Sequence, residues 1–169
     1  MTTDWICKHH SDLGKEQLYA ILKLRCEVFI VEQECAYLDI DGQDLEGDTL
    51  HLMGWQNDQL VAYARLLDPE SHAGDVVIGR VIVAPQARGH SLGHDLMDQA
   101  LHNIKENWPQ EPVFLSAQAH LQSLYAKHGF NAVGEPYFED NIPHIGMRLN
   151  VDAQGEFDTC LICSTCRAT

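Results

Sequence analysis

Basic residues are scarce in this sequence. The chain has 11 Lys and Arg residues against 25 Asp and Glu residues, which gives a formal net charge of −14 at pH 7. This surplus of carboxylates disfavours a nucleic-acid backbone or an anionic membrane surface as the main partner. A phosphate-bearing cofactor would have to be held by local backbone N–H groups and a helix N-terminus, because the overall field opposes it.

Targeting and membrane-spanning segments are also missing. Residues 1–5, Met-Thr-Thr-Asp-Trp, have neither the basic start nor the apolar run of a signal peptide, and no stretch reaches 18 apolar residues. These features predict a cytoplasmic protein. In a reducing compartment we expect its cysteines to be mostly free thiols. They are Cys7, Cys26, Cys35, Cys160, Cys163 and Cys166.

Metal-binding motifs are incomplete. The sequence has no HExxH motif, and Cys160, Cys163 and Cys166 lack the fourth ligand and the paired CxxC that a tetrahedral zinc site needs. No metal is therefore expected. The three thiols lie in a tail, residues 151–169, for which free thiols on a frayed or strand-adding segment are favoured over zinc.

The sequence does contain the pattern of one ordered domain, residues 1–150. Its 169 residues are 45% hydrophobic, and apolar residues at helical spacing predict helices over 16–29, from 92 to about 104, and over 120–128. Apolar runs predict strands at 50–56, 60–67, 76–83, 113–117 and 145–149, with further strands before the first helix and after residue 129. This order suits an α/β (α+β) fold with a mixed central β-sheet and helices on both faces.

Two charged features lie in the first helix and in the loop that follows it. Arg25 falls on the apolar face of the predicted helix, where a guanidinium needs a carboxylate or carbonyl partner. The loop over residues 37–48 is rich in carboxylates, which either attract a cationic acceptor or are ordinary solvated loop charge. They are Asp39, Asp41, Asp44, Glu46 and Asp48, and the same two interpretations apply to Glu32 and to Glu139-Asp140.

The motif most informative about chemistry follows the strand at 76–83. There the chain reads Ala84-Pro85-Gln86-Ala87 and then Arg88-Gly89-His90-Ser91-Leu92-Gly93, leading into the long helix. A strand that delivers a glycine-containing turn to a helix start gathers free N–H groups and the positive end of the helix dipole, which suits a pyrophosphate. The turn lacks GxGxxG and a following Lys-Ser/Thr pair, which disfavours a dinucleotide fold or a nucleoside triphosphatase.

These residues resemble the GNAT superfamily of acyl-CoA-dependent N-acetyltransferases. The turn matches that family's Arg/Gln-x-x-Gly-x-Gly/Ala as Arg88-x-x-Ser91-x-Gly93, and Gln118 to Phe130 resembles its later segment with a Tyr before Gly-Phe. Within the superfamily the chain is most similar to the ElaA-type branch, over about residues 5–150. The segments that carry this likeness are 24–29, 31–33, 39–42 and 142–147.

The resemblance implies a GNAT-like fold and acetyl-CoA (coenzyme A) as co-substrate. It implies that the pantetheine arm pairs with the backbone of Val81, Ile82 and Val83, and that Gln118 contacts the cofactor. The diphosphate would lie on the N–H groups of the turn, with Arg88 nearby. The turn residues concerned are Gly89, His90, Ser91, Leu92, Gly93 and His94.

The resemblance also implies direct attack by an amine on the thioester in a ternary complex, with Tyr125 as the acid for the departing thiolate. A phenol with a pKa of about 10 is protonated at neutral pH and suits this role. No Glu lies on the strand at 76–83, where some relatives carry the base. His144 and His51, expected to border the acceptor cleft, are the candidate bases, and a water relay is the alternative.

The resemblance leaves the acceptor open. A small cationic amine, or the Lys or N-terminal amine of a peptide, is the expected partner, and whether the chain forms a homodimer is not fixed by the sequence. Ser91 stands where the family has Gly; if φ is positive there, a Ser costs on the order of 1 kcal/mol. A non-catalytic acyl-CoA-binding or regulatory domain is therefore the alternative to a transferase.

Overall fold

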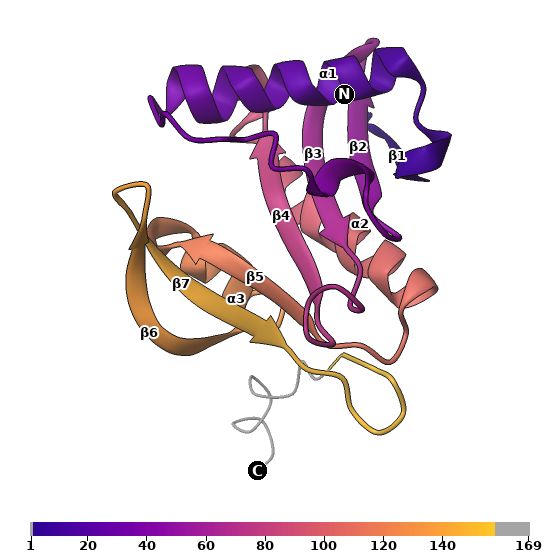
Figure 1. Cartoon of the computed structure of the whole chain (residues 1–169), viewed down its shortest axis with the longest axis vertical. Helices are drawn as coiled ribbons and strands as arrows, with labels where there is room; N and C mark the ends of the chain where they lie inside the picture. The colour runs from indigo at the N-terminus through magenta and orange to yellow at the C-terminus, as the bar shows by residue number, and fades with distance from the viewer. Residues whose placement is uncertain (1, 158–169) are drawn as a thin grey trace, which may run out of the picture.

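The computed structural model describes residues 2–157 (Figure 1). Cys160, Cys163 and Cys166, for which free thiols are predicted, lie outside the described residues. The helices are α1 (Lys15–Arg25), α2 (Leu92–Asn107) and α3 (Gln122–Ala126), and a π-helix, η2 (Cys26–Glu32), continues α1. The strands are β1 (Asp4–His9), β2 (Leu50–Gln56), β3 (Gln59–Leu67), β4 (Val76–Val83), β5 (Val113–Gln118), β6 (Asn131–Glu139) and β7 (Ile142–Leu149).

All strands join one seven-stranded sheet in the order β1-β2-β3-β4-β5-β7-β6. Every neighbouring pair is antiparallel except β4 and β5, which are parallel. Figure 1 shows α1 crossing one face of β2 and β3 while α2 lies behind the same strands. The predicted mixed sheet with helices on both faces is therefore confirmed.

The burial of the strands follows from these two helical layers. Nearly every residue of β2 and β3 is buried, as expected for strands covered on both faces. The hairpin between them turns at Asn57 and Asp58, whose φ values of 47° and 59° match the type I′ turn that suits two-residue hairpins. On α2 the buried side chains recur at helical spacing and form one stripe against the sheet. They are Leu92, Leu96, Met97, Ala100 and Ile104.

The first helix differs from the prediction in its second half. Residues 16–29 were expected to be one regular helix, but the α-helix ends at Arg25 and seven residues of π-helix follow. A π-helix winds more loosely and often lies at a functional site. Here it directs Phe29 and Glu32 toward the cavities described below.

The segment after β7 packs against the domain as far as the structure describes it. Val151 pairs with Phe157 in an isolated bridge, and Lys105 of α2 forms an ion pair with Glu156. The role of the tail stays a prediction. Within residues 2–157, none of the helices combines the length and the apolar character needed to cross a membrane.

Candidate functional site

The sheet opens between β4 and β5. These two strands pair only at Val76 with Val113 and at Val77 with Phe114, whereas β5 goes on to pair with β7 as far as Gln118 and His144. Beyond Val77, β4 is paired with β3 alone, as far as Val83. The edge of β4 that faces β5 therefore offers backbone groups to an extended ligand arm.

A cavity of about 760 Å³ lies at one end of this opening and is called here the turn cavity. Gln118 of β5, the end of β4 and the turn at 88–93 line it together, so the structure brings the predicted cofactor-binding residues to one place. His90 is the exception, because its exposed side chain does not line the cavity. The predicted residues that do are Val81, Ile82, Val83, Arg88, Gly89, Ser91, Leu92, Gly93, His94 and Gln118.

Backbone N–H groups converge at the start of α2. Gly89 and Ser91 have φ values of 87° and 61°, so the chain turns sharply before the helix begins. Leu92 and Gly93 form its first turn, where helix N–H groups have no internal partner. The N–H of His94 donates to the Ser91 carbonyl at 2.9 Å. That the N–H groups from Gly89 to His94 hold the diphosphate stays a prediction.

Arg88 lines the turn cavity, but its charge is paired. Its guanidinium donates to both carboxylate oxygens of Glu32, at 2.6 and 3.1 Å, and to the Val83 carbonyl at 3.0 Å. The hydrogen bond from Arg88 holds the pKa of the Glu32 carboxyl below its ordinary value. Arg88 therefore joins η2 to the end of β4 instead of presenting a free positive charge.

A second cavity, of about 450 Å³, adjoins the first and is called the central cavity. Tyr125 of α3 lines both cavities and is only 5% exposed. Its ring packs edge-on against Phe130, which follows Gly129. Burial raises the pKa of the Tyr125 phenol to about 12. The group therefore stays protonated and remains a proton donor at neutral pH.

His144 of β7 lines the central cavity and is held in one orientation. Its Nδ1 lies 2.8 Å from the Ile142 carbonyl, and its ring stacks on Tyr137 of β6. A carbonyl only accepts hydrogen bonds, so Nδ1 carries the proton. In the neutral ring the lone pair is then on Nε2, which is the form a general base requires.

His51 does not border either cavity. It is fully buried under the loop at 39–44, with Nδ1 2.8 Å from the Tyr63 hydroxyl and Nε2 2.8 Å from the Asp44 carbonyl. Burial lowers the pKa of its imidazole. The prediction that His51 lies near the acceptor cleft is wrong. Both of its ring nitrogens are engaged, which makes it a structural residue.

Three of the carboxylates of the acidic loop belong to a largely buried network of six charged side chains. Arg25 donates to Asp39 at 2.9 Å and to Asp44 at 2.5 Å, so the pairing predicted for Arg25 is found. Arg65 of β3 pairs with Asp41 and Asp44, and Arg80 of β4 pairs with Asp39 and Asp41. Neither solvated loop charge nor a free acidic surface describes these three Asp residues, because three guanidinium groups neutralise them.

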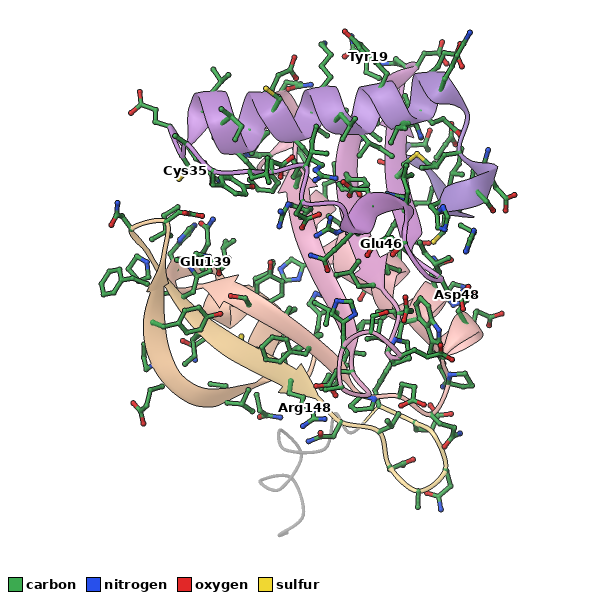
Figure 2. All side chains as sticks on the ribbon, viewed as in Figure 1. Tyr19, Cys35, Glu46, Asp48, Glu139 and Arg148 are labelled. Carbon is green, nitrogen blue, oxygen red and sulfur yellow. The ribbon has the colours of Figure 1, made fainter. Side chains whose placement is uncertain are left out.

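Two carboxylates that form no ion pair within residues 2–157 also line the central cavity. Glu139 and Asp140, at the turn between β6 and β7, both line it. The Cys35 sulfur is 4.0 Å from the Asp140 carbonyl oxygen, which joins this turn to the loop after η2. Figure 2 labels Cys35 on the loop after η2 and Glu139 at the β6–β7 hairpin, and both residues line the central cavity. Glu139 also accepts a hydrogen bond from Ser116 of β5 at 3.3 Å.

Several lining residues of the central cavity were not singled out from the sequence. Arg65 and Arg80 line it from β3 and β4, and β3 is buried on both faces, so alternation along that strand does not indicate this position for Arg65. His72, Gln43 and Ser116 come from loops or a short strand and carry no motif. Within residues 2–157, no group of three or more His, Cys, Asp or Glu side chains is placed to hold a metal ion.

The open sheet edge, the glycine turn and two cavities that meet at a buried phenol define the class of protein as an acyltransferase. A family model for the acetyltransferase (GNAT) domain matches residues 10–151. The chain therefore belongs to the GNAT family.

Similar proteins support the same assignment. Protein ElaA of Escherichia coli K12 is 54% identical over 148 residues, which span 88% of this chain and 97% of ElaA. The crystal structure of an acyl-CoA N-acyltransferase from Pseudomonas aeruginosa has a TM-score of 0.85 and 59% identity, over 87% of this chain and 99% of that one. The crystal structure of E. coli ElaA has a TM-score of 0.84 and 53% identity over the same shares.

Proposed function

We propose that this acyltransferase moves an acetyl group from acetyl-CoA to a primary amine in a ternary complex, in the cytoplasm. The observation that carries the proposal is the position of Tyr125 in the wall shared by the turn cavity and the central cavity. A thioester whose pantetheine arm follows β4 from the turn cavity reaches the central cavity at this phenol. The acceptor amine then enters from the opposite side.

The acceptor ammonium first loses one proton to solvent, and the protein then carries out two proton transfers. The lone pair of the neutral acceptor nitrogen attacks the thioester carbon and forms the C–N bond, and Nε2 of His144 takes a second proton from that nitrogen. The C–S bond then breaks, and Tyr125 gives its phenolic proton to the departing thiolate. Positioned proton transfers of this kind contribute roughly 10²- to 10⁴-fold each.

The acceptor is proposed to be cationic in solution, either a small amine or a peptide Lys or N-terminus. Glu139 and Asp140 are the carboxylates that would raise its local concentration. Asp41 also lines the central cavity, but its charge is balanced by Arg65 and Arg80. The field that favours a cation therefore comes from the β6–β7 turn and not from the loop at 39–48.

A non-catalytic acyl-CoA-binding domain is the second candidate function. Ser91 in place of Gly and the absence of a Glu on β4 favour it. The two candidates differ in whether the thioester is consumed, because a binding domain holds acetyl-CoA without turning it over.

The test is a screen of amines and peptides with acetyl-CoA, in which mass spectrometry detects acetylated product. For any acceptor found, Tyr125→Phe should lower kcat by about 100-fold and change acetyl-CoA affinity less than about threefold. Tyr19→Phe is the matched control, since Tyr19 is 73% exposed on α1 and lines neither cavity. Binding of acetyl-CoA with no consumption over the whole panel would establish the binding domain instead.

A further inference from the structure

A chain of three side chains leads from the surface of α2 into the turn cavity. Nδ1 of His94 is 3.0 Å from Nε2 of His128, and Nδ1 of His128 is 3.2 Å from a carboxylate oxygen of Asp98. His94 and Asp98 are one helical turn apart on α2, and His128 follows α3. The order Asp98, His128, His94 thus connects an exposed carboxylate with a ring that lines the cavity.

The direction of these hydrogen bonds follows from their acceptors. A carboxylate only accepts, so Nδ1 of His128 donates to Asp98. Burial lowers the pKa of His128 more than the charge of Asp98 raises it, and His94 lowers it further, so the His128 ring is neutral at pH 7. Its Nε2 must then accept, and Nδ1 of His94 must donate. The lone pair of His94 therefore lies on Nε2, which has no partner among the residues described.

The other charged groups around the turn cavity do not supply a free positive charge. Arg88 is paired with Glu32, and His120 and Tyr125 are the remaining titratable side chains in the wall. On α2 itself the neighbouring ionisable groups, Asp95 and Asp98, are acidic. Within the described residues, no Lys lines this cavity. An anionic ligand here therefore gains its positive counter-charge most directly from a proton on a histidine.

We propose that His94 is a proton-linked binding residue for a phosphate group of the acyl-CoA, oriented by His128 and Asp98. When the phosphate binds, Nε2 of His94 takes up one proton from solvent, keeps it, and donates a hydrogen bond to a phosphate oxygen, while Nδ1 keeps donating to His128. Asp98 stabilises the positive charge through His128. The inference rests on the proposed acyl-CoA site, and it adds a contact from the His94 side chain to those expected from the backbone N–H groups of the turn.

The consequence is a cofactor affinity that increases as the pH falls. An adjacent anion favours the charged form of an imidazole. Because only the protonated ring carries the charge that the phosphate favours, we expect acetyl-CoA to bind on the order of fivefold more tightly at pH 6 than at pH 8. The phosphates of the cofactor also titrate near neutral pH. The part of the pH dependence that comes from the protein is therefore obtained by comparing variants with the wild type.

The experiment is isothermal titration of the whole chain with acetyl-CoA, at about pH 6, 7 and 8 and in two buffers with different ionisation enthalpies, so that proton uptake is measured. His94→Gln keeps a hydrogen-bonding side chain but cannot be charged. It should bind about fivefold more weakly at pH 6, differ less than twofold at pH 8, and take up fewer protons at pH 7. His102→Gln, at an exposed position of α2 outside both cavities, is the control and should match the wild type.

Two further measurements separate the possible failures. Asp98→Asn, at a side chain 69% exposed, should lower proton uptake without unfolding the chain, and it serves as the test if His94→Gln does not fold. S-acetylpantetheine, which has no diphosphate, should show no difference between wild type and His94→Gln. If all variants bind acetyl-CoA with equal proton uptake, the role of His94 is overturned, while the proposed acyl-CoA site is not. A wild-type chain that does not bind acetyl-CoA at any pH would overturn the acyl-CoA site as well.

Discussion

At the scale of single residues, Ser91 is where backbone geometry and ligand chemistry conflict. It precedes α2 with φ 61° and ψ 5°, a left-handed conformation that costs a non-glycine residue on the order of 1 kcal/mol. Its side chain makes no capping hydrogen bond to the helix. The residue therefore carries strain at the place where the diphosphate is expected, and only a contact with the ligand would offset it.

Ser91→Gly tests whether such a contact exists. We expect the variant to melt at an equal or slightly higher temperature, because up to about 1 kcal/mol of strain is released. We expect the Michaelis constant for acetyl-CoA to stay the same or fall, measured in steady-state assays at saturating acceptor. A Michaelis constant raised by about threefold or more would instead show that the hydroxyl donates to the phosphate, since that corresponds to losing about 0.7 kcal/mol of binding.

His144→Gln tests the assignment of the base. Gln can hydrogen-bond in the same space but cannot accept a proton, so kcat should fall by about 100-fold while the acetyl-CoA dissociation constant changes little. The measurement is steady-state turnover with equilibrium binding in parallel, and His102→Gln is the control. If His144→Gln retains most of its turnover, a water relay carries the proton and His144 only shapes the cavity.

At the scale of elements, the buried ion pairs join four segments far apart in the sequence. Arg25 ends α1, Arg65 lies on β3, Arg80 lies on β4, and their carboxylates come from the loop between η2 and β2. Asp44 is shared by Arg25 and Arg65 and is 5% exposed. Because burial makes any uncompensated charge expensive, the network holds this loop against the sheet beside the central cavity.

Asp44→Asn should therefore destabilise the fold strongly at pH 7. Removing one carboxylate leaves the Arg25 and Arg65 charges undercompensated, which typically costs about 3–5 kcal/mol when a buried pair is broken. The free energy of unfolding in urea measures this loss. Asp48→Asn is the matched control, because Asp48 is 76% exposed in the same segment, and it should change the stability by less than about 0.5 kcal/mol.

The pH dependence of that difference has a defined sign. Burial raises the pKa of the Asp44 carboxyl, but the hydrogen bonds and charges of Arg25 and Arg65 outweigh burial and leave the pKa below its ordinary value. A carboxyl with a lowered folded-state pKa stabilises the protein above its unfolded pKa of about 3.9, and this stabilisation is lost as the pH falls through the folded value. The gap between wild type and Asp44→Asn should thus narrow below about pH 4. A gap that stays constant down to about pH 2 would exclude this linkage.

Much of the arrangement of elements could be predicted because local patterns carry it. The bounds of β2 and β4 follow from runs of apolar residues, and the hairpin turn follows from Asn57 and Asp58. The π-helix could not be distinguished, since Val28 and Phe29 fit an α-helical face equally well. Most of β6 was also hidden, because it is an exposed edge strand that contains Gly134 and Pro136, two residues that ordinarily interrupt strands.

The site was predictable where a motif is contiguous and not where contacts join distant segments. The turn at 88–93, apart from His90, and Tyr125 line the same cavity, and their roles stay predictions. His51 was misplaced because alternation along β2 does not separate inside from outside when both faces are buried. The pairing of Asp44 with Arg65 and of His94 with His128 depends on side chains that only the folded chain brings together.

At the scale of the whole molecule, charge is distributed unevenly between inside and outside. The buried network contains three arginines and three aspartates and is neutral, so the net charge of −14 is carried elsewhere on the chain. An acyl-CoA, which is itself polyanionic, approaches such a surface against the field, whereas a cationic acceptor approaches with it. The two substrates should therefore respond to salt in opposite directions.

Raising the ionic strength from about 0.03 M to about 0.3 M shortens the Debye length from roughly 18 Å to roughly 6 Å and screens this field. The association rate of acetyl-CoA, measured by stopped flow, should rise by a few fold. The kcat/KM of a cationic acceptor should fall by a similar factor, while a neutral amine of the same size, as control, should change little.

If acetyl-CoA instead associates more slowly at high salt, positive charge local to the turn cavity outweighs the molecule's overall charge during encounter. An acceptor preference for anionic amines at low salt would contradict the cationic acceptor and would remove Glu139 and Asp140 from its recognition.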